Sequence, residues 1–503
     1  MRAARDQDLP PSPGLKRTAV GGVGWNILSY VGGKVLVLAS TVILARLLTP
    51  EDFGVVGLAL VFITYADVLT DLGAAEALIY LPRSRRLNDG ALTISLLWSA
   101  LLTVVAVATA PAVARFFHSD AVTPLFRVLA LSLVLGGTAQ VPDALLRKEL
   151  QFRRRMAADL GRAVSQGVIS VALAIAGLGV WAIVYGYVGG DLVWSAVAWS
   201  LVDYRPGRGF WRIRRETIRP LLAFGIPAVG SALLLVLVFN VDYLIVGRRL
   251  PPRDLGYYTL AFRVPQTLII YLFYTLSTVA FPLFSRTRAE PDHLKRGYLT
   301  SLRIQNAYGA AVGVGIAAVA PMLVEVVFGP KWRPSIVPLE AIALYAMFRA
   351  FGTGAGDVYK GIGRPRISLW LAIVRLVVLV PLLWLAADPA FGSRAIDYVS
   401  WVQTAVAFIM AALMQVVAAR VIGVSLRQLA GTLRPAVLVA AGTAAGAGAI
   451  RLWVRLPDSD PLKLVASITS GAVLGLILLY TLDRGFATEL VGLLKAWRRT
   501  SST

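Results

Sequence analysis

The sequence has no cysteine and only two histidines among its 503 residues. The absence of cysteine excludes disulfides, catalytic thiolates and cysteine-based metal sites. The two histidines, His118 and His293, both fall in breaks between apolar segments. We therefore expect neither a bound metal nor an organic cofactor.

Charged residues are also scarce: they make up 16% of the chain, against roughly 25% in soluble domains. Hydrophobic residues make up 57%, and the mean hydropathy is +0.70. Apolar runs of about 20 residues recur from end to end, and each is long enough to cross a bilayer core of roughly 30 Å. The two-residue alternation of membrane β-barrels is missing. The composition predicts an all-α integral membrane protein.

Charged or turn-rich breaks divide the chain into about fourteen predicted transmembrane helices. They fall at 20–45, 53–74, 89–112, 122–142, 157–178, 181–202, 219–246, 255–284, 297–321, 335–357, 366–386, 396–418, 434–454 and 462–482. The first run is too long for the core of a signal peptide, so we expect it to be retained. The residues before it, 1–19, are predicted to be a disordered cytoplasmic tail.

Lysine and arginine are distributed unevenly between the predicted loops. An even number of helices places both termini on one side of the membrane, and the segments on that side carry most of the basic residues. The positive-inside rule therefore predicts cytoplasmic termini in a bacterial inner membrane. The net charge of +22 is better explained by these loops and by contact with anionic membrane lipids than by nucleic acid, which we do not expect as a partner.

One phrase occurs twice, as ARLLTPEDFGVVGLA at 45–59 and as GRRLPPRDLGYYTLA at 247–261. Seven of the fifteen positions are identical. Each copy links a predicted helix that ends outside to one that begins outside, and six predicted helices separate the copies. The repeat therefore predicts two parallel six-helix bundles, an arrangement found in transporters.

This repeat sets the predicted domain boundaries. They are an N-terminal bundle at 20–202, a basic cytoplasmic linker at 203–218, a C-terminal bundle at 219–418, two extra helices at 419–482 and a basic cytoplasmic tail at 483–503.

The repeated phrase has a local structural interpretation. Thr49 or Asp52 can cap the helix that follows, and the glycines allow close packing at its start. We assign a structural role to the hairpin residues Arg46, Pro50, Asp52, Gly54, Asp242, Arg248, Pro252, Asp254 and Gly256. For Asp242 we expect an ion pair with Arg248 or Arg46.

Both hairpins resemble the signature hairpins of bacterial polysaccharide flippases, the Wzx-like transporters of the multidrug/oligosaccharidyl-lipid/polysaccharide exporter superfamily. The second match extends over NVDYLIVGRRLPPRDLGYYTLAFRVP, and LLRKELQFRRR at 145–155 resembles the colanic-acid-exporter type. The resemblance implies flipping of undecaprenyl-pyrophosphate-linked oligosaccharide by alternating access, driven by a proton or sodium gradient. It also implies partners in polysaccharide assembly, such as a polymerase.

Seven basic residues lie inside predicted helices: Lys34, Arg127, Arg162, Arg263, Arg303, Arg349 and Arg375. A charge at the centre of a membrane helix costs at least about 2.5–3.5 kcal/mol, so it needs a partner, water or a ligand. Arg127 and Arg162 lie near helix ends, where they can snorkel. We predict the other five as substrate-binding residues of a cationic lumen. Ion pairs between helices are the alternative.

Three acids are candidates for ion coupling. Asp67 and Asp71 are four residues apart in the predicted helix 53–74, which would place them on one face. Asp191 lies inside the predicted helix 181–202. Asp71 has a second interpretation, as part of a cytoplasmic gate or an interface pair.

Other functions remain open from the sequence. A lipid II flippase or a drug/cation antiporter of the same superfamily would share the predicted fold. A scaffold for polymer assembly would need no transport path. A glycan polymerase or ligase would need acid, base or metal groups on long outer loops, so we do not expect an enzyme.

Overall fold

A computed structural model of the chain describes residues 32–33, 35–211, 214–286, 290–489 and 492. Lys34 and the predicted N-terminal tail lie outside these residues, as does most of the predicted C-terminal tail. Within the described part every regular element is a helix, which confirms the predicted fold class.

The first half contains the helix Val35–Leu47 and seven labelled helices. They are α2 (Pro50–Asp67), α3 (Ala74–Tyr80), α4 (Arg85–Phe117), α5 (Val122–Leu129), α6 (Leu131–Lys148), α7 (Phe152–Ile175) and α8 (Val180–Leu201). The long helix α9 (Arg215–Arg249) follows the linker.

The second half begins with α10 (Pro252–Pro265), which continues through the π-helical segment η1 (Gln266–Ile270) into α11 (Tyr271–Arg286). It goes on with α12 (Pro291–Leu323), η3 (Val324–Phe328), η4 (Pro330–Ser335), α13 (Ile336–Gly361), α14 (Pro365–Ala386), η5 (Pro389–Arg394) and α15 (Ala395–Ile422). The chain then forms α16 (Leu426–Gly431), α17 (Arg434–Trp453) and α18 (Pro461–Leu482).

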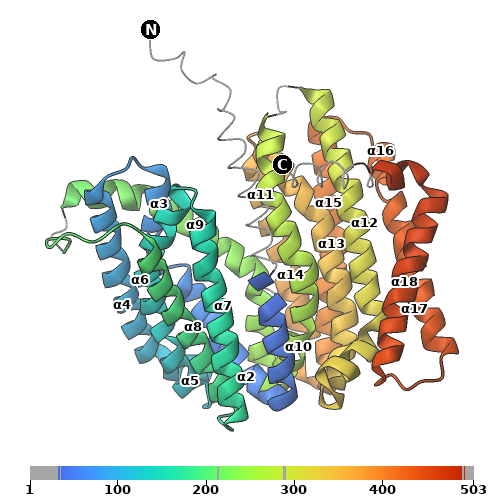
Figure 1. Ribbon diagram of the computed structural model, residues 1–503, viewed down its shortest axis with the longest axis horizontal. Coiled ribbons are helices and arrows are strands. Elements are labelled where there is room, and N and C mark those ends of the chain that lie inside the picture. Colours follow the sequence, from blue (N-terminus) through green and yellow to red (C-terminus); the bar gives the residue numbers. More distant parts are fainter. Residues whose placement is uncertain (1–31, 34, 212–213, 287–289, 490–491, 493–503) are drawn as a thin grey trace.

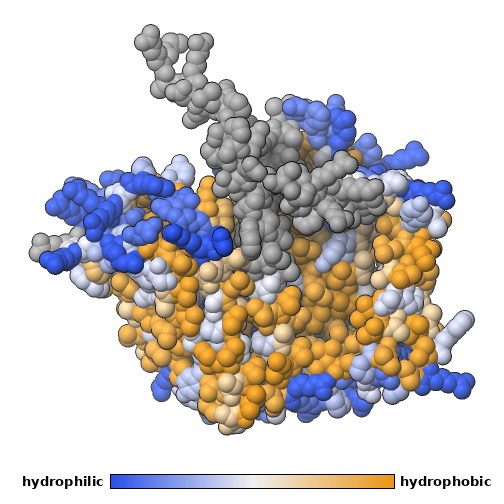
Figure 2. Space-filling view, viewed as in Figure 1, coloured by the Kyte–Doolittle hydropathy of each residue, from blue (hydrophilic) through white to orange (hydrophobic). Residues whose placement is uncertain are grey.

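Figure 1 shows two helical lobes, with α4 to α8 in one and α11 to α15 in the other. The helices α17 and α18 pack on α12 at the far edge of the second lobe. We call the end where α2 and α10 begin, lower in Figure 1, the hairpin end, and the opposite end the linker end. On the face shown in Figure 2, a broad apolar band lies between the two polar ends.

Each of the fourteen predicted ranges falls on a helix, but only eleven of the described helices are both long and apolar enough to cross a membrane. The helix Val35–Leu47 is short in the described part, and α2 contains three acids within 18 residues. The π-helical segment η1 divides the helix of residues 252–286. The number of fourteen crossings therefore stays a prediction.

The helix α9 contacts both lobes. Near its start, Phe224 stacks on Tyr80 of α3 with ring centroids 5.0 Å apart. Near its other end, Arg249 Nη2 lies 3.5 Å from Asp388 Oδ2 of the second lobe, and the guanidinium carbon of Arg249 lies 4.7 Å from the ring centroid of Trp384 in α14. The linker and α9 therefore join the two lobes from the linker end to the hairpin end.

The two copies of the repeated phrase pack directly against each other at the hairpin end. A Cβ added to Gly54 would lie 1.7 Å from the carbonyl oxygen of Pro252, and a Cβ added to Gly256 would lie 1.8 Å from that of Pro50. The contact is reciprocal, as expected for parallel repeats related by an axis along the membrane normal. Glycine is required here because the two backbones touch.

Segment η3–η4 of the second lobe forms hydrogen bonds with the end of the helix Val35–Leu47. Arg46 Nε donates a hydrogen bond to a carbonyl oxygen of η3 at 2.9 Å. In the other direction, Lys331 Nζ donates to the carbonyl of Leu48 at 2.6 Å, and Trp332 Nε1 donates to that of Ala45 at 2.8 Å. These bonds satisfy carbonyls that a helix end leaves without an intrahelical partner.

The two hairpins differ in how their second helix is capped. In the first, Asp52 Oδ2 accepts a hydrogen bond from Thr49 N at 2.8 Å, and Thr49 Oγ1 accepts one from Asp52 N at 3.2 Å. Pro251 stands at the cap of α10 and has no side chain that can accept such a bond. Asp254 lies in the first turn of α10, where an acid complements the helix dipole.

The prediction that Asp242 forms an ion pair with Arg248 or Arg46 is wrong. Its carboxylate accepts a hydrogen bond from Tyr258 Oη at 2.8 Å instead. Arg46 is bound to η3, and Arg248 Nη1 lies 2.6 Å from His118 Nδ1 at the end of α4. Each hairpin arginine therefore contacts the opposite lobe rather than the buried acid.

We expect Gly54→Ala to lower stability by roughly 1–3 kcal/mol, because the added methyl group overpacks a backbone contact. Gly256→Ala should have the same effect. Gly57→Ala is the matched control, since a Cβ at that position would meet its neighbours at 3.5 Å. Thermal unfolding of the purified protein in detergent measures the effect. Equal melting temperatures for Gly54→Ala and Gly57→Ala would contradict this account of the contact.

Candidate substrate-binding cavity

A cavity of about 540 Å³ lies between the two lobes. It is lined by the helix Val35–Leu47, the first half of α7, Tyr187 of α8 and the stretch from α10 to α11. Three arginines face it, Arg155 and Arg162 from the first lobe and Arg263 from the second. The arginines outnumber the one lining acid, Asp159, so the cavity is suited to an anion.

The polar lining of α7 forms a single stripe. Arg155, Asp159, Arg162 and Gln166 follow one another at intervals of four, three and four residues, which places them on one helical face. The predicted helix began at 157, which left Arg155 in a loop, and Arg162 was interpreted as snorkelling. The observed α7 begins at Phe152. The 3.6-residue period of polar residues from 155 to 166 is the signal that would have identified this face.

Arg162 is held by the predicted acid Asp191. Arg162 Nη2 lies 2.5 Å from Asp191 Oδ1, and the aspartate is buried on α8. The guanidinium carbon of Arg162 also lies 5.3 Å from the ring centroid of Trp194 and 5.8 Å from that of Tyr187. The ion pair and the two rings together fix the guanidinium group at the cavity wall.

Arg155 belongs to a second ion-pair network, at the linker end of the first lobe. Its Nε lies 2.7 Å from Asp143 Oδ1, while Arg147 Nε lies 2.9 Å from Asp143 Oδ2. Arg147 Nη1 in turn lies 2.7 Å from Glu76 Oε1. The network anchors the start of α7 to α6 and α3.

Arg263 is the predicted binding residue that reaches the central cavity. It lies in the last turn of α10, just before η1, and Gln266 and Thr267 of η1 line the cavity beside it. Its Nε has no hydrogen-bond partner in the described part of the chain. A π-helical segment at this position is typical of a functional site.

Arg349 and Arg375 form a separate cluster inside the second lobe. Arg349 donates hydrogen bonds to Tyr345 Oη at 2.9 Å and to Tyr274 Oη at 2.6 Å, and Arg375 donates to Tyr345 Oη at 3.2 Å. The guanidinium of Arg349 stacks 3.8 Å from the centroid of Phe239. Tyrosine hydroxyls and aromatic rings, rather than carboxylates, hold these two charges in the described structure.

The remaining predicted residues lie elsewhere. Arg303 is exposed on α12 and lines neither group. Asp67 ends α2 outside the lining of the central cavity, with its Oδ1 facing Gly136, but it is close enough to Arg162 and Asp191 to interact with both electrostatically. Asp71 is buried and accepts hydrogen bonds from the backbone nitrogens of Gly73 at 3.0 Å and Ala75 at 2.8 Å. The expectation that Asp67 and Asp71 share a helical face is wrong, because α2 ends between them and Asp71 caps α3.

A second hollow, of about 440 Å³, is almost wholly apolar. It runs between α12, α13 and α15 of the second lobe and the added helices α16 and α17, with Phe348, Phe351 and Phe408 on its wall. It lies within the apolar part of the molecule, so it is suited to a hydrocarbon chain.

Comparison with known proteins identifies the family. A family model described as "Polysaccharide biosynthesis protein" matches residues 43–337. The lipopolysaccharide biosynthesis protein WzxC of Escherichia coli (strain K12) is 25% identical over 379 residues, which cover 73% of this chain and 75% of that protein. The succinoglycan biosynthesis transport protein ExoT of Rhizobium meliloti (strain 1021) is 24% identical over 369 residues, with coverages of 72% and 73%.

Among solved structures, the lipid II flippase MurJ in its inward closed conformation is similar, with a TM-score of 0.73. The match covers 92% of this chain and 99% of that one at 13% identity. The TM-score shows that the two proteins share a fold, and at this low identity the match shows the fold alone.

We expect Asp191→Asn to lower stability by about 2 kcal/mol, because it leaves the Arg162 charge in a largely buried position without its partner. Adding Arg162→Gln to Asp191→Asn should recover part of the loss. Asp203→Asn serves as the control, since Asp203 is exposed and lies 3.5 Å from Arg154, a surface pair worth little. Unfolding of the purified variants tests this, and additive losses would argue against coupling of the pair.

Proposed function

The chain belongs to the family of polysaccharide biosynthesis proteins, and from this premise we propose that it flips undecaprenyl-pyrophosphate-linked oligosaccharide repeat units across the bacterial cytoplasmic membrane. In this proposal the protein is a transporter and not an enzyme. Both termini lie in the cytoplasm, so the linker end faces the cytoplasm and the hairpin end faces outward. A polymerase or other assembly protein receives the flipped repeat unit.

The observation that carries the proposal is the central cavity with arginines from both lobes. Arg162 of the first lobe and Arg263 of the second line the same cavity, and arginine binds phosphate through two parallel hydrogen bonds. A pyrophosphate has enough oxygens to contact both arginines at once. Since each arginine belongs to a different lobe, bound substrate bridges the two bodies that must move during transport.

The apolar hollow supports the lipid-linked form of the substrate. A polyprenyl carrier needs an apolar surface, and the hollow between α13, α15 and α17 supplies one. A soluble oligosaccharide would have no use for this surface. We propose that the carrier chain lies there while its pyrophosphate enters the central cavity.

The place where the lobes touch supports a proposal of alternating access. The hairpins close the cavity toward the outside, and α7 lines it from its linker-end start onward. Opening the hairpin end would release the glycan outward. We propose Asp191 and Asp67 as the groups through which an ion gradient biases this exchange, since Asp71 is occupied as a helix cap.

The basic lining of the central cavity also argues against one of the alternative functions. A cation antiporter would need acids on the cavity wall, whereas this wall carries three arginines and one lining acid. A lipid II flippase carries the same pyrophosphate linkage, so the cavity suits it too. The family of the chain favours the polysaccharide substrate.

We expect Arg263→Gln to reduce polysaccharide at the cell surface at least tenfold, because the second-lobe contact with the pyrophosphate is lost. Arg303→Gln removes the same charge from an exposed position on α12 and should leave export unchanged. Surface glycan in a host that depends on this chain measures both, after normalisation to the amount of protein in the membrane. Normal export by Arg263→Gln would refute the role of the central cavity.

The absence of native cysteine allows a clean test of alternating access. A Cβ on Gly57 would lie 3.5 Å from Thr259 Oγ1, so Gly57→Cys combined with Thr259→Cys should form a disulfide between α2 and α10. We expect the oxidised protein to lose export and a reductant to restore it. The two single variants control for the substitutions themselves. Full export by the cross-linked protein would contradict an opening at the hairpin end.

A further inference from the structure

A small polar cavity lies at the linker end of the first lobe, apart from the central cavity. Its volume is about 230 Å³, and it is formed by the start of α4, the linker and the start of α9. Its lining residues are Arg86, Asp89, Gly90, Gly209, Phe210, Arg214 and Thr217. The volume is sufficient for a phosphate group with its ester oxygens.

Fixed contacts hold the walls of this cavity. Thr93 Oγ1 donates a hydrogen bond to the carbonyl of Phe210 at 2.7 Å, which ties the linker to α4. The hydroxyl of Tyr204 donates a hydrogen bond to Asp89 Oδ1. Burial and this carboxylate raise the pKa of Tyr204 above its usual range, so the hydroxyl stays protonated and continues to donate. Asp89, the one acid on the wall, therefore has one oxygen already occupied.

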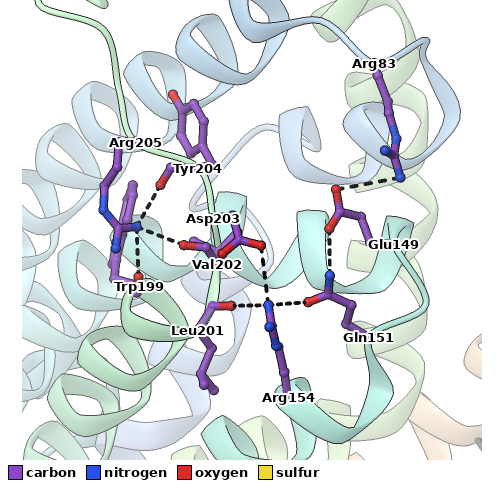
Figure 3. Close-up of polar contacts among 10 residues, drawn as sticks. All are labelled: Arg83, Glu149, Gln151, Arg154, Trp199, Leu201, Val202, Asp203, Tyr204 and Arg205. Carbon is purple, nitrogen blue, oxygen red and sulfur yellow. Dashed lines mark hydrogen bonds and ion pairs between the residues drawn. The ribbon is translucent and has the colours of Figure 1, made fainter.

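Two neighbouring arginines, Arg205 and Arg154, hold the linker in place (Figure 3). Arg205 Nη1 donates to the carbonyls of Val202 at 2.8 Å and Tyr204 at 2.9 Å. Arg154 Nη1 donates to the carbonyl of Leu201 at 3.2 Å. In the first lobe these arginines satisfy backbone oxygens beyond the end of α8.

Arg86 and Arg214 differ from Arg205 and Arg154 in their contacts. Both are exposed, both line the small cavity, and neither takes part in an ion pair or side-chain hydrogen bond within the described part of the chain. Together they outnumber Asp89, the one acid among the described lining residues, and one oxygen of Asp89 is already occupied by Tyr204. The described lining therefore carries a net positive charge, which attracts an anion. Their placement therefore indicates an anionic ligand.

The surroundings of the cavity indicate where that anion comes from. Trp211 is 57% exposed, and its ring centroid lies 4.0 Å from that of Phe210 on the cavity wall. Tryptophan beside arginine is typical of the boundary between lipid headgroups and hydrocarbon. Hydrophilic residues cover this end of the first lobe directly above the apolar band (Figure 2).

We propose that this cavity binds the phosphate of an anionic phospholipid headgroup, with Arg86 and Arg214 as its cationic partners and Trp211 at the headgroup boundary. The Thr217 hydroxyl, at the start of α9, adds a donor on the same wall. A bound headgroup connects α4, the linker and α9, and α9 is the helix that contacts both lobes. The lipid thereby holds α4, the linker and α9 in the arrangement seen in this structure. This site is separate from the central cavity and does not depend on the proposed function.

The test uses the purified full-length chain in a neutral detergent. Short-chain phosphatidylglycerol, short-chain phosphatidylcholine and inorganic phosphate are titrated separately, and the melting temperature gives an apparent Kd for each. We expect phosphatidylglycerol to stabilise the protein by several degrees and the other two to have little effect. Each of Arg86→Gln and Arg214→Gln should weaken the apparent binding about fivefold, as expected for one basic residue near an anionic surface.

Arg208→Gln is the matched control, because Arg208 is an exposed linker arginine that does not line the cavity. It should bind phosphatidylglycerol like the unaltered chain. Equal stabilisation by phosphatidylcholine would overturn the assignment to an anionic headgroup, and equal stabilisation by inorganic phosphate would overturn the assignment to a lipid. Equal weakening by Arg208→Gln and Arg214→Gln would overturn the assignment to this cavity.

Discussion

The contact between two pairs of backbone groups at the hairpin end is the constraint on which the rest of the structure depends. Gly54 lies against the carbonyl of Pro252, and Gly256 lies against that of Pro50. No side chain fits between them, so this is where the two lobes approach most closely in the repeat. Hydrogen bonds between η3–η4 and the first hairpin join the two lobes at the same end. Joined at one end, the lobes leave the central cavity between them.

The buried arginines of both lobes have partners that reduce the free-energy cost of placing a charge inside a membrane protein. Arg162 is neutralised by Asp191, and Arg155 shares Asp143 with Arg147. The second lobe uses a different chemistry, because Arg349 and Arg375 rely on tyrosine hydroxyls and the ring of Phe239. Arg349 and Arg375 therefore keep their positive charge inside the second lobe without a carboxylate ion-pair partner in the described structure, apart from the central cavity.

The linker end has its own electrostatic organisation. Arg205 and Arg154 bind backbone oxygens and so shape the linker, while Arg86 and Arg214 face a small cavity. Basic residues on the predicted cytoplasmic side therefore do more than set topology. Because α9 runs from this cavity to the hairpins, events at the two ends of the molecule are connected through one helix.

The sequence by itself determined the all-α membrane fold, the duplicated hairpins and the family, because apolar length and repeated wording are local properties. It also identified Arg263 and Asp191, since a charge inside an apolar run is visible without a structure. Only the tertiary structure decided which charges meet. In the folded protein Arg162 pairs with Asp191, whereas Arg349 and Arg375 lie in a separate cluster. Asp71 accepts hydrogen bonds from backbone nitrogens at the start of α3, and Asp242 accepts one from Tyr258. Such partners lie on different helices, and their distances follow from how the helices pack, which no single helix encodes.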